Sequence, residues 1–242
     1  RWYARAGKRG HIEAQYRLGK MYENGRGVDR NTLEAKNWYG VAAEAGHTDA
    51  QYRLATFYRA GKGVPKDAAE AFGWYHRAAN TDHGPAQYWL GMLYEFGRGV
   101  AVDLDKATGW YQRAAESLKQ AADREDAEAQ FLLGEMLLWA RGIPGDEPEA
   151  MKWFLKAARQ EHGEAQYRLA MLYHNRGGVD QNVAKAVRWY TAAAQLGHEK
   201  AQYRLAEMFR KGDVIEKDYA EAARWYRPVA ESGHARSQYL LG

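Results

Sequence analysis

A six-residue phrase that returns seven times constrains this chain more than any other feature of its sequence. It first appears as Ala14-Gln15-Tyr16-Arg17-Leu18-Gly19. Related phrases begin at Ala50, Ala86, Ala129, Ala165, Ala201 and Ser237, and the starts are 36 residues apart except for one gap of 43 residues. Self-similarity at a fixed period of this size predicts a repeat array in which each repeat packs on its neighbours.

Each repeat carries two helical patterns. In the first pattern, apolar residues such as Ala14, Leu18 and Tyr22 recur on one face, and the pattern ends at a Gly-x-Gly turn. The second begins at a polar capping residue such as Asn31, with a glutamate three residues later, and contains a tandem aromatic pair. The short connections predict antiparallel packing of the two helices. We name them helix A, about residues 12–24 in the first repeat, and helix B, and we predict an all-α fold of A–B hairpins.

The shared pattern A-x-x-x-L-G-x-x-Y-x-x-G-x-G-V-x-x-D-x-x-x-A-x-x-W-Y-x-x-A-A-x-x-G resembles the Sel-one-like repeat, a relative of the tetratricopeptide repeat. The resemblance covers essentially the whole chain. It implies a right-handed α-solenoid superhelix with a concave face lined by A helices, and the function of a scaffold or adaptor for protein complexes. It also favours a bacterial periplasmic or secreted location. We expect a single array with repeats near 12–47, 48–83, 84–126, 127–162, 163–198 and 199–234, and half-repeats at 1–11 and 235–242.

Composition and motifs argue against most other classes of protein. The net charge of +4 is spread along the chain without a long basic run, which argues against nucleic-acid binding. There are no cysteines, and no apolar run is long enough for membrane insertion. No serine lies in a nucleophile motif, and no metalloprotease or phosphate-binding motif is present. We therefore predict a non-enzymatic protein that needs no cofactor.

Six histidines occupy the same position between repeats, namely His11, His47, His83, His162, His198 and His234. Equivalent residues of stacked repeats should be separated by a helix-packing layer of roughly 10 Å. One metal ion needs all its ligands within about 2 Å. The sequence therefore predicts no metal site, and gives these histidines a role at the turn into helix A.

The 43-residue gap contains seven extra residues, about 116–122, which continue the apolar stripe of the preceding B helix. Seven residues are close to two helical turns and add about 10 Å. We therefore predict a long, protruding B helix. It is either a neutral insertion or a landmark for a partner or for self-association. Loops near Ala140, at 176–178 and at 212–214 depart from the glycine pattern and predict different turns.

One stripe on helix A changes character in the middle of the array. The first repeat carries Glu13, Arg17, Lys20 and Asn24 there, the third carries Pro85, Trp89, Met92 and Phe96, and the fourth carries Glu128, Leu132, Glu135 and Trp139. Arginines flank this apolar patch in the neighbouring repeats, as around interface hot spots. Candidate partner-binding residues are therefore Tyr88, Trp89, Met92, Phe96, Leu132, Glu135, Trp139, Arg53 and Arg168. The alternatives are that the aromatic side chains pack against the long helix, and that the arginines pair with acidic residues of adjacent repeats.

Our leading hypothesis is a scaffold that binds a peptide or protein segment in the concave groove. A second hypothesis, by analogy with secreted relatives, is a binder or hydrolase of small molecules or cell-wall fragments. The cysteine pairs of the relatives linked with β-lactam binding are absent here. A third hypothesis is head-to-tail self-assembly through the unpaired helices around Trp2 and Leu240, which lack polar caps.

Overall fold

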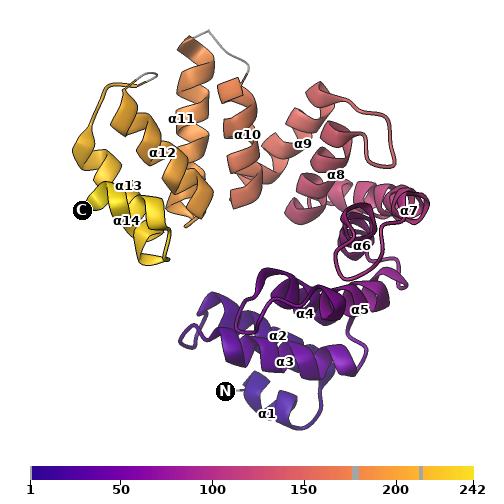
Figure 1. Cartoon of the computed structure of the whole chain (residues 1–242). Coiled ribbons are helices and arrows are strands. Elements are labelled where there is room, and N and C mark those ends of the chain that lie inside the picture. The colour runs from indigo at the N-terminus through magenta and orange to yellow at the C-terminus, as the bar shows by residue number, and fades with distance from the viewer. Residues whose placement is uncertain (1, 176–179, 213–214) are drawn as a thin grey trace. The chain divides into compact units, whose positions relative to one another are not determined.

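The computed structural model describes residues 2–175, 180–212 and 215–242, and within them the chain forms helices and no strand (Figure 1). The A helices are α2 (Ile12–Asn24), α4 (Thr48–Ala60), α6 (Gly84–Phe96), α8 (Ala127–Trp139), α10 (Gly163–Asn175), α12 (Glu199–Lys211) and α14 (Ala235–Leu241). The B helices are α1 (Trp2–Lys8), α3 (Thr32–Glu44), α5 (Ala68–Ala79), α7 (Leu104–Asp123), α9 (Glu147–Arg159), α11 (Asp180–Gln195) and α13 (Tyr219–Glu231). The predicted all-α fold of helix hairpins is confirmed.

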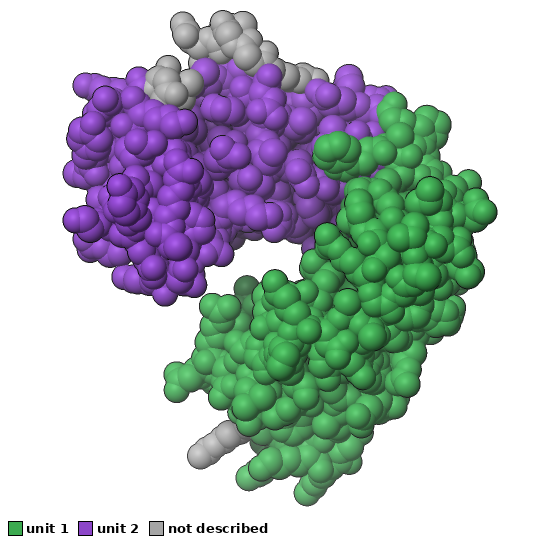
Figure 2. All heavy atoms as spheres, viewed as in Figure 1, with its two compact units in different colours: residues 1–120, 139–145 green, residues 121–138, 146–242 purple. Residues whose placement is uncertain are grey.

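The chain divides into two compact units (Figure 2). Unit 1 comprises residues 1–120 and 139–145, and unit 2 comprises residues 121–138 and 146–242. In each unit the core between the helices is built from alanines and large aromatic side chains, as around Tyr39 in unit 1 and Tyr190 in unit 2. Small residues let helix axes approach closely, and the aromatic rings fill the remaining space.

The recurring phrase is mainly a packing device. Where it ends in glycine before a complete B helix, at Gly19, Gly91 and Gly134, that residue faces an aromatic ring of the following B helix: a Cβ added at Gly91 would lie 2.7 Å from the ring of Tyr111. Alanine takes this place at residues 55, 170 and 206. The glutamine of the phrase donates a buried hydrogen bond to the carbonyl eight residues earlier, as Gln87 does to Ala79 at 3.2 Å. The same bond recurs at Gln15, Gln51, Gln130, Gln166, Gln202 and Gln238. It ties the start of each A helix to the end of the preceding B helix.

The histidines are N-caps of the A helices, which confirms their predicted role. Nδ1 of His47 accepts a hydrogen bond from the amide of Ala50 at 3.3 Å, and the other five make the equivalent bond. Asp126 replaces histidine before α8 and caps the helix with its carboxylate at 2.8 Å. An Nδ1 that accepts an amide proton leaves Nε2 as the donor of the neutral ring.

The predicted long B helix is confirmed as α7, which has 20 residues. Its extension does not stand free on all sides, because Leu118 and Ala122 are buried. A Cβ at Gly84 would lie 3.0 Å from Cγ of Leu118, so this part of the helix packs closely on the start of α6. Its opposite side, with Lys119 and Gln120, is exposed.

The loop at Ala140 corrects one prediction. Ala140 takes a φ of +51°, the left-handed conformation that Gly25 adopts after α2 with a φ of +67°. The turn after α8 therefore begins as in the first repeat, although its residue lacks the conformational freedom of glycine. The other two unusual loops, at 176–178 and 212–214, fall largely outside the described residues.

Candidate functional site

The predicted apolar stripe is only partly available to a ligand. Trp89 is half-buried in unit 1, with the guanidinium carbon of Arg59 lying 3.8 Å from its ring centroid. The ring of Tyr75 stacks on it at 6.4 Å, and the edge of Tyr88 meets it at 5.5 Å. Trp89 is therefore held between a cation and two aromatic rings, and Met92 one turn later is half-buried as well.

Phe96 and Trp139 are the apolar residues of the stripe that are exposed to solvent. Phe96 ends α6 with 48% of its surface exposed, and Trp139 ends α8 with 55% exposed. Both belong to unit 1. The guanidinium of Arg141 lies 5.9 Å from the Phe96 ring. Apolar rings exposed beside an arginine are the combination that is enriched at protein interfaces.

Arg141 is held by a polar network that the sequence did not predict. Its Nε lies 3.0 Å from Oε2 of Glu95, and its Nη1 donates to the Tyr88 hydroxyl at 3.2 Å. The Tyr111 hydroxyl donates to the same Glu95 carboxylate. Burial, together with that carboxylate, raises the pKa of Tyr111 well above its usual value. Tyr88 is itself buried, so its role here is to position Arg141.

Leu132 requires a correction, since its side chain has no exposed surface. Residues 129–136 of α8 are buried without a break, so helix neighbours cover positions that face solvent in the first repeat. Glu135 is also buried, and its two carboxylate oxygens lie 2.7 Å from Nε and 2.8 Å from Nη2 of Arg168. Arg53 is half-buried and interacts with Tyr16. Partner binding by this set stays a prediction, now centred on Phe96 and Trp139.

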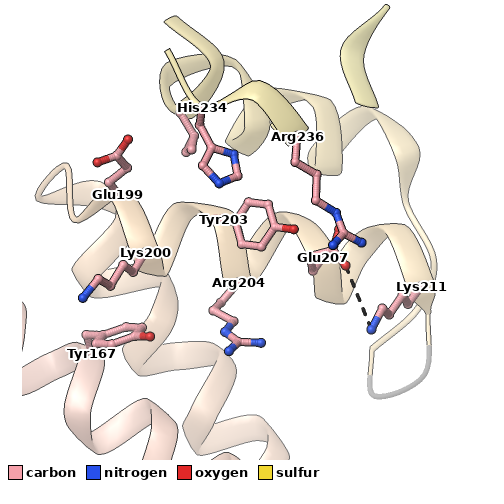
Figure 3. A pocket seen from close by; sticks show the side chains of 10 residues that line it. Tyr167, Glu199, Lys200, Tyr203, Arg204, Glu207, Lys211, His234 and Arg236 are labelled. Atoms are coloured by element: carbon pink, nitrogen blue, oxygen red, sulfur yellow. Dashed lines mark ion pairs between the residues drawn. The ribbon is translucent and has the colours of Figure 1, made fainter. Parts of the chain in front are cut away.

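A second surface lies in unit 2, where residues of α10, α12, α13 and α14 and the capping His234 line a pocket of about 670 Å³ (Figure 3). Its lining residues are Tyr167, Glu199, Lys200, Tyr203, Arg204, Glu207, Lys211, Val229, His234 and Arg236. Four of them are cationic at neutral pH and two are carboxylates, so the lining carries a formal charge of +2. This volume falls within the usual range of ligand pockets.

Two of the four cations of this pocket come from a change at the second residue of the A helices. That position holds Glu13, Asp49, Glu128 and Glu164 in four repeats, and each carboxylate lies close to Nε2 of the next capping histidine. The distances are 3.1, 3.3, 3.0 and 3.3 Å. At the start of α12 and α14 the same position holds Lys200 and Arg236. This reversal of charge is visible in the sequence.

Two other kinds of site find no support in the described part of the chain. No group of three or more histidine, aspartate or glutamate side chains there could hold a metal ion. None of the helices described combines the length and the hydropathy required to span a membrane.

Comparison with known proteins gives one family. The Sel1 repeat model matches residues 12–47, 48–83, 84–117, 127–162, 163–198 and 199–234. A Sel1 repeat protein from Oxalobacter formigenes is 31% identical, with a TM-score of 0.59 over 90% of this chain and 84% of that one. No curated protein matches.

Two further solved structures share the fold at lower identity. An immunity protein from Pseudomonas aeruginosa is 21% identical, with a TM-score of 0.56 over 92% of this chain and 82% of that one. A putative Sel1 repeat protein from Klebsiella pneumoniae is 22% identical, with a TM-score of 0.53 over 85% of this chain and 97% of that one.

Proposed function

We propose that this chain, which belongs to the Sel1 repeat family, is a non-enzymatic scaffold that binds a peptide or protein segment along its A helices. Sel1 repeats are generally protein-interaction scaffolds, and this role agrees with the absence of a catalytic motif in the sequence. Repeats 12–47 to 199–234 act as one array in this proposal, with residues 1–11 and 235–242 as half-repeats. The observation that carries it is the exposure of Phe96 and Trp139 at the ends of two A helices.

The exposed rings of Phe96 and Trp139 could contribute to the free energy of binding. A large aromatic side chain can bury about 150–250 Å², and each Å² of apolar surface contributes about 25 cal/mol. About half of each ring is still exposed at Phe96 and Trp139, so each can contribute about 2 kcal/mol to an interface before the costs of association. Arg141 is already fixed by Glu95 and Tyr88, so ordering it on binding costs little entropy.

Peptide display on the purified chain tests this proposal. Peptides enriched on the wild-type protein are synthesised, and their affinity is measured by fluorescence anisotropy. We expect Phe96→Ala and Trp139→Ala each to weaken binding about tenfold or more, as about 2 kcal/mol implies. Leu33→Ala is the matched control, because Leu33 is 57% exposed on the B helix α3. Equal affinity of all three variants, or the failure of any peptide to enrich, would refute the proposal.

A further inference from the structure

We propose that the pocket formed by α10, α12, α13 and α14 is a second binding site, which takes carboxylate side chains of an acidic peptide segment. The inference rests on the proposed peptide-binding role, but it uses residues that lie entirely in unit 2 and away from the aromatic site in the sequence. It assigns a ligand chemistry to a surface that neither the repeat pattern nor the family match addresses.

Arg204 lacks the acids that hold its equivalents in other repeats. Arg17 pairs with Glu13 in its own helix at 2.6 Å, and Arg168 pairs with Glu135 of the preceding A helix at 2.7 Å. The corresponding positions around Arg204 hold Lys200 and Met171. Within the described residues no carboxylate lies within 4 Å of the charged groups of Lys200, Arg204 or Arg236.

Both carboxylates of the pocket already accept hydrogen bonds from other side chains. Glu207 accepts two hydrogen bonds from Arg210, at 3.1 and 3.0 Å, and another from the Tyr226 hydroxyl. The bonds from Arg210 hold the pKa of Glu207 below its usual value, so it stays ionised and committed to that partner. Glu199 accepts a hydrogen bond from Ser232. Neither acid is placed to neutralise Arg204 or Lys200 as Glu13 neutralises Arg17.

The cations are distributed around an aromatic ring. In Figure 3 the ring of Tyr203 lies in the middle of the pocket, with Lys200 to its left, Arg204 below it, and Arg236 and Lys211 to its right. Lys211 is 4.0 Å from Glu207 and half-exposed, so this pair is weak. Cations on both sides of an aromatic ring suit an extended ligand with several carboxylates better than a single small anion. A guanidinium such as that of Arg204 can bind a carboxylate bidentately.

A peptide fits this surface better than a nucleic acid does. A phosphate backbone is bound by a continuous basic stripe. Here the cationic positions are confined to α12 and α14, while the same position holds Glu164 in α10. Glu199 and Glu207 also stand among the cations, which interrupts a path for regularly spaced phosphates. Separate side-chain carboxylates can be placed between these acids.

The test uses a fluorescein-labelled decapeptide of alternating glutamate and leucine, and the same peptide with glutamine in place of glutamate. The key variant is Lys200→Glu with Arg236→Glu, which restores the type of residue that four other A helices carry and so preserves the fold. The control is Arg26→Glu with Lys62→Glu, which makes the same change of net charge at exposed loop residues of unit 1. Thermal unfolding followed by circular dichroism checks the fold of both variants.

We expect the glutamate peptide to bind the wild-type protein and the control, and to bind the Lys200→Glu/Arg236→Glu variant at least tenfold more weakly. The glutamine peptide should bind all three weakly. Equal binding of the two peptides, or equal loss in the control, would overturn the inference. A single-stranded oligonucleotide that binds more tightly than the peptide, and is lost in the same variant, would overturn it in favour of phosphate.

The aromatic variants separate this inference from the proposed function. Phe96→Ala and Trp139→Ala should leave affinity for the glutamate peptide unchanged, because neither residue lines the pocket. If display-selected peptides bind through Phe96 and Trp139 while the glutamate peptide does not bind, the pocket inference fails alone. If the glutamate peptide binds through Lys200 and Arg236 while no selected peptide depends on the aromatic residues, the aromatic site fails alone.

Discussion

Gly134, which ends the recurring phrase in α8, should resist even the small enlargement to alanine. We expect Gly134→Ala to destabilise the protein, because the added Cβ would lie 2.6 Å from Cε1 and 2.7 Å from Cδ1 of Phe154. Ordinary contacts of a Cβ are 3.4 Å or longer. Phe154 is fully buried, so its ring cannot move aside without disturbing the neighbouring core.

The magnitude follows from two opposing effects. Overpacking a well-packed core costs about 1–3 kcal/mol, whereas replacing glycine by alanine inside a helix gains about 1 kcal/mol. The net loss expected for Gly134→Ala is therefore up to about 2 kcal/mol. Gly109 is the matched control, since it lies inside α7 with nothing within 4 Å of its added Cβ. Gly109→Ala should stabilise the protein by up to about 1 kcal/mol.

Urea unfolding followed by far-ultraviolet circular dichroism measures both changes through the shift of the midpoint. A third variant tests the cause: in a Phe154→Leu background the aromatic ring is gone, and Gly134→Ala should then cost about 1 kcal/mol less than in the wild type. If Gly134→Ala stabilises the protein as Gly109→Ala does, or if its cost is the same in the Phe154→Leu background as in the wild type, steric conflict with the aromatic ring is not the reason for the glycine.

Two further predictions concern charged groups. Arg168→Ala leaves the carboxylate of Glu135 buried without the guanidinium that lies 2.7 Å away, and should destabilise the protein by about 2–3 kcal/mol in urea unfolding. This is less than the cost of breaking a fully buried pair, because Arg168 is partly exposed. The joint replacement Arg168→Leu with Glu135→Leu should recover most of the loss, and no recovery would contradict the desolvation argument. Hydrogen bonds from His83 and His198 hold the pKa values of Asp49 and Glu164 below their usual values. The unfolded chain therefore binds protons first as the pH falls, so the stabilisation from these two carboxylates is present above about pH 4 and is lost below it. Asp49→Asn with Glu164→Gln should flatten the acid limb of the curve of melting temperature against pH. An unchanged curve would show that these contacts do not contribute to stability.

The sequence was sufficient to predict the repeats, the hairpins, the capping histidines and the long helix α7, because each depends on neighbours within one period of the chain. It was not sufficient to predict which residues of the A-helix stripe reach solvent. Leu132 and Arg17 occupy equivalent positions, yet Leu132 is buried and Arg17 is exposed. Periodicity gives the direction of a side chain on its helix, but it does not give the neighbour that covers that direction.

Long-range polar contacts were missed for a related reason. Arg141 meets Glu95 and Tyr88 across 46 and 53 residues of sequence. The spacing of the repeats does not identify this contact, since the loop after α8 differs in sequence from the loops after other A helices. The basic pocket is different, because its signal could be read directly: acids at the second position of four A helices give way to Lys200 and Arg236.

The replacement of the acid by Lys200 can be compared with changes at the same positions of other repeats, where an acid, an arginine and a capping histidine recur. In the third repeat the acid becomes Pro85, the arginine becomes Trp89, and the next capping histidine becomes Asp126, so all three partners change. In the fourth repeat Leu138 replaces the residue equivalent to Glu23, and Phe154 lacks the hydroxyl with which Tyr39 bonds Glu23 at 2.7 Å.

The fourth repeat keeps Glu128 and His162 while Leu132 replaces the arginine, and the sixth repeat also changes one of these three residues alone. There the acid alone is replaced, by Lys200, while Arg204 and His234 remain. Lys200 contributes to lowering the pKa of Glu164, after the larger effect of His198, but it also places an ammonium group one helical turn from Arg204, and like charges at short range oppose the folded state. An external carboxylate that binds both groups gives a reason to keep them together. Lys200→Glu should raise the melting temperature and abolish binding of the glutamate peptide, which would show that the lysine serves binding at the expense of stability. A lower melting temperature with unchanged binding would instead assign Lys200 to the packing of α12.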